Sequence, residues 1–135
     1  MNNDTRIFVN LPVKDLNKSI DFFTELGYKF NPQFTDRNAT CMIVNENIFV
    51  MLVVEEFFKT FTKKVISDAS RSTEVIVALS AENRGEVDDL ADKAFAAGAK
   101  IANDPYDHGW MYGRSFHDPD SHLREIFYMD SAKAG

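Results

Sequence analysis

Alternating apolar and polar residues predict that the chain begins with a strand over residues 7–13. One face of this strand would carry Ile7, Val9, Leu11 and Val13, and the other Phe8, Asn10 and Pro12. A helix is predicted from Asp15, a suitable N-cap, to Leu26, because apolar residues recur there at helical spacing. Gly27 follows, where a left-handed residue commonly ends a helix. Short strands are then predicted over residues 28–30, 39–44 and 48–54, which gives the order β-α-β-β-β.

The same order recurs in the second half of the chain. A strand is predicted over residues 74–80, a helix over residues 86–97 that ends at Gly98, and strands over residues 100–102, 110–116 and 123–129. Between the halves, apolar residues at helical spacing predict a connecting helix at about residues 56–69. The repeat predicts two related modules, at about residues 5–55 and 73–130, within a single domain spanning residues 1–135.

The segment FHDPDSHLRE, residues 116–125, is predicted to be the tip of a β-hairpin. Its Asp118-Pro119-Asp120-Ser121 sequence has turn chemistry, because Pro119 restricts one φ angle and the polar side chains can bond the backbone. In the outgoing strand, Glu125 shares a face with Leu123 and Phe127. A carboxylate between apolar neighbours is costly to bury, so Glu125 needs a cation, a proton or a polar ligand. This position is therefore a candidate site.

Three segments of the chain resemble the vicinal oxygen chelate superfamily, which contains glyoxalases, extradiol dioxygenases and bleomycin-resistance proteins. VNLPVKDLNKSIDFFTELGYKF, residues 9–30, resembles the opening strand and helix of that family, and EVDDLADKAFAAGAKI, residues 86–101, resembles its second helix. Asp118-Pro119-Asp120 matches the hairpin motif of the family, with Ser121 in place of the usual glycine. Glu125 matches the last metal-binding glutamate of the family.

The resemblance implies an α+β fold in which two βαβββ modules form a curved, eight-stranded mixed sheet with a concave ligand cup. The metal-ligand positions of the family fall on Phe8, on Val50 or Met51, on Glu74 and on Glu125. No histidine stands among them, whereas a catalytic zinc or iron site usually has three protein ligands that include imidazole. Without a metal, the two carboxylates would share a proton or attract a cationic group.

Several further residues are candidates for contact with a ligand in this cup. The ligand-contacting side chains are predicted to be Phe8, Asn10, Met51, Trp110, Tyr112 and Arg114, with Met111, Gly113 and Ser115 as the alternative register of the seventh strand. Arg114 would alternatively pair with Glu125 or Glu74 and form an ion-pair network without chemistry. His117, at the end of that strand, is a further candidate metal ligand, although loop histidines more often bond backbone or water.

Composition excludes several partners. The net charge is −6 and no large basic cluster occurs, which disfavours nucleic-acid binding. The longest apolar run, residues 48–54, is too short to cross a bilayer, and the first residues contain no apolar targeting core, so no membrane association is expected. The single cysteine, Cys41, excludes an internal disulfide and favours a cytoplasmic location.

Two functions remain open from the sequence. The first is a small-molecule-binding protein of the bleomycin-resistance type, with an acidic, aromatic-lined cup and no cofactor. The second is a glyoxalase-like lyase or isomerase that uses a divalent metal ion and acts on a small carbonyl substrate, with Glu125 as metal ligand and Glu74 as ligand or general base. Phe8, in a position where a ligand is expected, favours the first. A homodimer is expected, both because relatives of this size are commonly dimeric and because phenylalanines cluster in the connecting helix.

Overall fold

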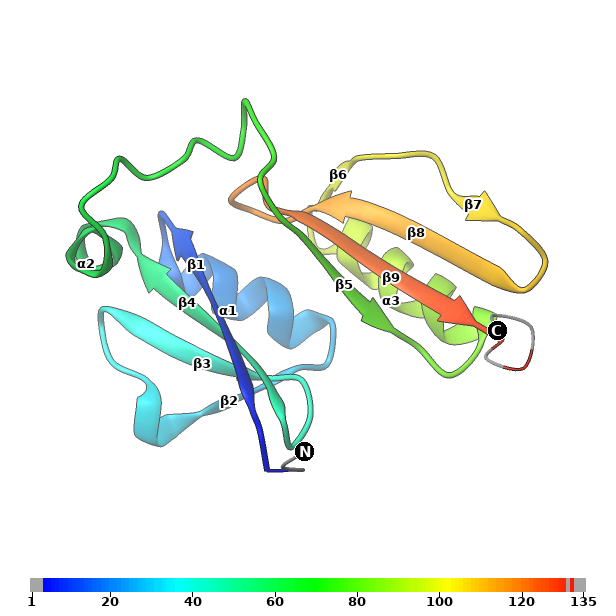
Figure 1. Cartoon of the computed structure of the whole chain (residues 1–135), viewed down its shortest axis with the longest axis horizontal. Coiled ribbons are helices and arrows are strands. Elements are labelled where there is room, and N and C mark those ends of the chain that lie inside the picture. The colour runs from blue at the N-terminus through cyan, green and yellow to red at the C-terminus, as the bar shows by residue number, and fades with distance from the viewer. Residues whose placement is uncertain (1–3, 131, 133–135) are drawn as a thin grey trace. The chain divides into compact units, whose positions relative to one another are not determined.

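The computed structural model describes residues 4–130 and 132, and the chain divides between Ser67 and Asp68 into two compact units. Figure 1 shows that each unit consists of a sheet with a long helix on one face. This is the α+β class that the sequence predicts.

The first unit contains the elements β1 (Ile7–Val13), α1 (Leu16–Glu25), β2 (Lys29–Asn31), the 3-10 helix η1 (Pro32–Phe34), β3 (Ala39–Ile43) and β4 (Ile48–Val54). Its sheet has the strand order β1-β4-β3-β2, with β1 parallel to β4 and the other pairs antiparallel. The strand and helix positions agree with the predicted ones to within two residues, except for η1, which was not predicted.

Local chemistry explains where α1 begins and ends. The Asp15 carboxylate accepts a hydrogen bond from the Lys18 backbone N–H at 3.1 Å, which satisfies one free donor at the helix start. Gly27 follows the helix with a φ of +100°, the left-handed conformation that glycine adopts without strain. The core of the unit lies under α1. Its fully buried members include Val13, Met42, Val50 and Leu52.

The connecting helix is shorter than predicted. α2 covers only Glu55–Phe58 and continues as the 3-10 helix η2 over Lys59–Phe61, and residues 62–69 contain no helix. The prediction of a helix to residue 69 is therefore wrong. A short helix in water needs an apolar face packed against other elements, but Val65, which the predicted apolar stripe included, is 94% exposed.

The second unit contains the elements β5 (Ile76–Ser80), α3 (Arg84–Ala96), β6 (Lys100–Ile101), β7 (Tyr106–Asp107), β8 (Met111–His117) and β9 (Leu123–Met129). Its strand order, β5-β9-β8-β6, repeats that of the first unit, and β7 pairs in addition with β8. Gly98 ends α3 with a φ of +107°, as Gly27 ends α1. The internal repeat is thus present in the topology, and β7 is an addition that the sequence analysis missed.

The described strands belong to two sheets, of four and five strands. The single curved eight-stranded sheet and its concave cup remain a prediction. No helix in residues 4–130 or at residue 132 is both long and apolar enough to span a membrane.

Candidate functional site: the open face of the second sheet

One face of the second sheet is closed by α3, and polar side chains of β8 contribute to the contact. The Tyr112 hydroxyl donates a hydrogen bond to the Asp88 carboxylate on α3. Arg114 lies 3.1 Å from Asp88 and 3.0 Å from Asp92, measured from its Nη1 atom to the carboxylate oxygens. Of the two registers predicted for this strand, the structure has the alternative one. Tyr112 and Arg114 face α3, and Met111, Gly113 and Ser115 lie on the face that carries Glu125. Tyr112 and Arg114 are amphipathic, so they cover α3 while their polar ends reach carboxylates on the helix.

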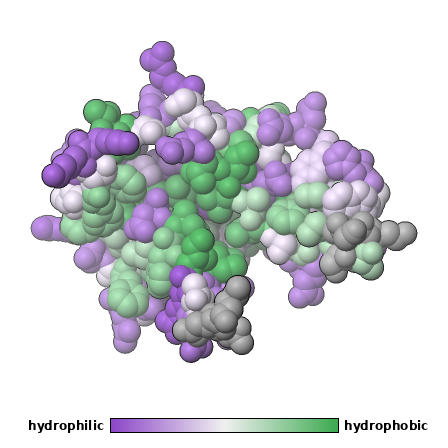
Figure 2. Space-filling view, in the orientation of Figure 1, coloured by the Kyte–Doolittle hydropathy of each residue, from purple (hydrophilic) through white to green (hydrophobic). Residues whose placement is uncertain are grey.

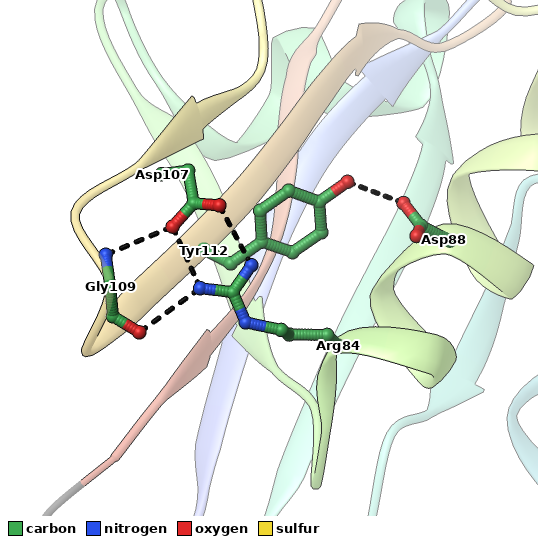
Figure 3. Close-up of polar contacts among 5 residues, drawn as sticks. All are labelled: Arg84, Asp88, Asp107, Gly109 and Tyr112. Atoms are coloured by element: carbon green, nitrogen blue, oxygen red, sulfur yellow. Dashed lines mark hydrogen bonds and ion pairs between the residues drawn. The ribbon is translucent and has the colours of Figure 1, made fainter.

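Arg84, the first residue of α3, connects the helix to the last residue of β7 and to the loop that follows it (Figure 3). Its guanidinium donates two hydrogen bonds to the Asp107 carboxylate, at 2.9 and 2.7 Å, and a third to the Gly109 carbonyl at 3.0 Å. It also lies over the Tyr112 ring, 4.9 Å from the centroid. Hydrogen bonds from Arg84 and from the Gly109 backbone hold the pKa of Asp107 well below its usual range.

The opposite face of the sheet carries Glu125, and we call it the open face. Strand pairing places Ser115 of β8 and Ala78 of β5 directly beside Glu125. Leu123 and Phe127, two residues away on β9, point to the same side and give the carboxylate apolar neighbours. Glu125 is half-buried there. The predicted environment of Glu125 is thus present in the structure.

Tyr106 of β7 supplies the polar partner of Glu125. Its hydroxyl donates a hydrogen bond of 2.7 Å to Glu125 Oε1. Burial, together with the hydrogen bond and the negative charge of Glu125, raises the pKa of Tyr106 well above its usual value of 10.0. The ring of Tyr106 lies on Gly113 of β8, its partner in the strand pair, and a Cβ atom at Gly113 would overlap the ring.

The structure does not bring Glu74 to this position. β5 begins at Ile76, and Glu74 precedes it as an exposed residue, so its assignment to the strand is wrong. The residue beside Glu125 is Ala78, four positions further along the chain, which corresponds to about 13 Å along a strand. The hypothesis of two facing carboxylates loses its geometric basis.

The donor set at Glu125 does not fit a catalytic metal ion. His117 lies on the same strand face as Ser115 and Gly113 and pairs with Leu123, which makes it a diagonal neighbour of Glu125. Within residues 4–130 and 132, however, no three His, Cys, Asp or Glu side chains are grouped so that they could hold a metal. A catalytic zinc or iron ion usually needs three protein ligands.

The face of the first sheet opposite α1 brings together three other predicted ligand-contacting residues. Phe8 stacks on Phe49 of β4, with ring centroids 4.7 Å apart and an interplanar angle of 12°. Asn10 pairs with Met51, so Phe8, Asn10 and Met51 point to one side. Val50 points to the other side and is fully buried, which resolves the register of β4. Phe8 is 46% exposed, and Figure 2 shows apolar surface over the strands of this unit.

The sequence analysis did not identify Tyr106 as a site residue. Trp110, a predicted ligand contact, precedes β8 and is 37% exposed. One signal for Tyr106 was present. Gly113 stands inside a strand, where glycine weakens pairing and often marks a close approach by another group. The approaching group could not be identified from the sequence, because β7 is only two residues long.

Comparisons with known proteins agree with this fold. Residues 5–45 match the family model described as bleomycin resistance protein-like, N-terminal. A hypothetical protein of S. aureus is 28% identical in sequence, with a TM-score of 0.77 over 90% of this chain and 92% of that one. A glyoxalase-related enzyme of Fulvimarina pelagi is 20% identical, with a TM-score of 0.76 over 90% and 85% of the two chains.

A further solved structure, a glyoxalase/bleomycin resistance protein/dioxygenase family enzyme of Burkholderia phytofirmans, is 16% identical, with a TM-score of 0.74 over 90% and 96% of the two chains. At such identities the last two similarities establish the fold alone. No curated protein matches the chain in sequence.

Proposed function

We propose that this chain is a small-molecule-binding protein of the bleomycin-resistance type within the vicinal oxygen chelate superfamily. Its fold and the match of residues 5–45 to the bleomycin resistance protein-like model support this proposal. The observation that carries the proposal is the Glu125 carboxylate on the open face of the second sheet. It is half-buried between Leu123 and Phe127 and is bonded to the Tyr106 hydroxyl. Apolar walls with a few fixed polar groups are typical of small-molecule sites.

The chemistry of this face favours a planar or cationic ligand. An ionised carboxylate only accepts hydrogen bonds, so Glu125 selects ammonium, amidinium or hydroxyl groups. Phe127 on the same face offers a ring for contact with a planar group. The net charge of −6 adds long-range attraction for a cation.

The residues around Glu125 also support binding without a resident metal ion. Its strand neighbours Ala78 and Ser115 carry neither a carboxylate nor an imidazole, which leaves Glu125 without the further donors that a catalytic ion requires. The alternative function, a metal-dependent lyase or isomerase acting on a small carbonyl compound, would need Glu125 as a ligand and His117 as a second donor from the same face. Two such donors fall short of the three protein ligands that a catalytic ion usually takes.

The test uses two probes, bleomycin and benzamidine, the second of which is a planar amidinium ion at neutral pH. Isothermal titration calorimetry should detect binding of at least one probe, and Glu125→Gln should weaken it tenfold or more because the charge-assisted hydrogen bond is lost. Glu82→Gln, at an exposed position before α3, is the matched control and should leave affinity unchanged.

The same protein, purified without chelator, should contain less than one tenth of an equivalent of divalent metal. It should also yield no product from methylglyoxal and a thiol when Zn²⁺, Mn²⁺ or Ni²⁺ is added. Stoichiometric metal together with turnover would replace the binding function with the enzymatic one.

We further place this function in the cytoplasm and in a homodimer. Cys41 is a free, buried thiol, in keeping with a reducing compartment. The Phe61 ring contacts the rings of Phe57 and Phe58 near the end of the first unit. Phe61 is 54% exposed, so an apolar surface is available for a second copy.

A further inference from the structure

Gly113 makes room for Tyr106 on the open face of the second sheet. The two residues are partners in the β7–β8 pair, and the Tyr106 ring lies where a side chain at position 113 would otherwise project. Glycine inside a strand costs stability relative to a residue with a side chain, so its presence here has a local reason. The reason visible in the structure is the close contact between ring and backbone.

This placement carries the Tyr106 hydroxyl to Glu125. Gly113 pairs with Phe127, and Glu125 lies one step diagonally away on the same face, within reach of a ring that crosses the strand. The Tyr106 hydroxyl donates a hydrogen bond of 2.7 Å to Glu125 Oε1. A ligand with an amidinium group bonds a carboxylate through both oxygens and would need Oε1 as well, so Tyr106 and such a ligand compete for Oε1.

The segment that carries Tyr106 is short, and its link to α3 is exposed to solvent. β7 is two residues long, and its bond to α3 is the Arg84–Asp107 ion pair, whose side chains are 41% and 54% exposed. The two hydrogen bonds of this pair strengthen it, but water screens both exposed charges. His108 adds a ring contact with Tyr106, with centroids 5.5 Å apart. Short, exposed segments of this kind open more readily than core strands.

We propose that the Tyr106 hydroxyl occupies the hydrogen-bond acceptor of Glu125 in the free protein, with its ring packed on Gly113. An organic cation then binds by displacing the Tyr106 hydroxyl from Glu125. Tyr106 thereby sets the selectivity of the site, because a ligand must bond Glu125 better than the phenol does. This inference rests on the proposed function for its ligand, but the seating of Tyr106 can be tested without any ligand.

The binding test compares the affinity of benzamidine for four proteins by calorimetry. Tyr106→Phe removes the competing hydrogen bond and should tighten binding by roughly tenfold. Gly113→Ala unseats the whole ring and should tighten binding as well. Tyr112→Phe is the matched control: it removes the same kind of phenol–carboxylate bond, to Asp88, but on the face covered by α3. It should leave the affinity unchanged.

Unchanged or weaker binding by Tyr106→Phe, in a protein that binds the probe, would overturn the displacement proposal. If none of the four proteins binds benzamidine or bleomycin, the proposed function fails for this class of ligand. The seating of Tyr106 is then judged by the ligand-free measurement below, so the two failures are distinguishable.

The ligand-free measurement follows tyrosine ionisation by NMR of protein labelled with ¹³C at the tyrosine Cζ atom, and Tyr106→Phe assigns the resonance. Tyr106 should resist ionisation in the native protein and should titrate at lower pH in Gly113→Ala and in Glu125→Gln, because its pKa is raised by burial and by Glu125. An identical titration of Tyr106 in native protein and in Gly113→Ala would show that the glycine does not seat the ring, and the proposal would be abandoned.

Discussion

Asp118 and Arg124 form a buried ion pair beneath the β8–β9 hairpin, with Asp118 Oδ2 3.1 Å from Arg124 Nε and side-chain exposures of 3% and 4%. The second oxygen of Asp118 accepts hydrogen bonds from the Asp120 and His122 backbone N–H groups. The carboxylate therefore shapes the turn and balances a buried cation at the same time. This gives the Asp-Pro-Asp motif a structural role, separate from the open face that carries Glu125.

Replacement of Asp118 should be costly. Asp118→Asn keeps an oxygen for the turn but removes the charge that faces Arg124, so we expect a loss of about 3 kcal/mol in the free energy of unfolding. Asp107→Asn, at the exposed ion pair with Arg84, should cost much less, because water screens that pair. Urea denaturation of both variants measures the difference, and equal losses would contradict this account.

The two glycines that end the long helices should each be sensitive to substitution. Gly27 and Gly98 have φ angles of +100° and +107°, and at either one a Cβ atom would meet no atom within 4 Å beyond its immediate chain neighbours. The expected cost of Gly27→Ala or Gly98→Ala is therefore purely conformational, about 1 kcal/mol. Thr24→Ala, on the exposed side of α1, is the control and should not destabilise. Thermal unfolding of the three variants provides the measurement.

Ser121 should show the opposite response. It has a φ of 67°, the left-handed region, and is the only non-glycine residue among residues 4–130 and 132 with a positive φ. Ser121→Gly should stabilise the protein by roughly 1 kcal/mol, because the strain of a Cβ atom in this conformation is relieved. Ser121→Ala keeps the Cβ atom and serves as the comparison. A loss of stability in Ser121→Gly, measured by urea denaturation, would argue against strain at this position.

Alkaline pH should weaken the second unit. The pKa values of Tyr106 and Tyr112 are raised above 10.0, the first mainly by burial and the second mainly by its hydrogen bond to Asp88. Because the folded state holds these protons more tightly than the unfolded state, their contribution is complete below pH 10 and is lost as pH rises through the raised values. Tyr106→Phe should show a smaller alkaline loss of stability than the native protein, as followed by urea denaturation across this pH range.

The homodimer can be tested at the phenylalanine cluster. Sedimentation velocity at micromolar concentration should show a dimer for the native protein and a shift toward monomer for Phe61→Ser, since a polar residue would replace an exposed ring. Val65→Ser, at a residue that is 94% exposed but outside the ring cluster, is the control. A native protein that sediments only as a monomer would rule out this assembly.

The sequence alone was enough to predict the repeated order of elements. Apolar alternation located β1 and β9, and helical spacing with Asp15 and Gly27 at the ends located α1 to within one residue at its start. These signals are local, since each depends on residues a few positions apart. The family resemblance rested on the same local segments, and one of them lies within residues 5–45, which match the bleomycin resistance protein-like family model.

Tertiary structure decided which face of each strand meets a helix and which stays open. Alternation divides β8 into two sets of residues, but it does not show that Tyr112 and Arg114 bond carboxylates on α3. Their shared partner Asp88 lies 24 and 26 positions before them in the chain. Nor does it reveal that Tyr106 reaches Glu125 across Gly113. Such pairings depend on contacts between segments distant in sequence, and an amphipathic side chain fits either face until its partner is known.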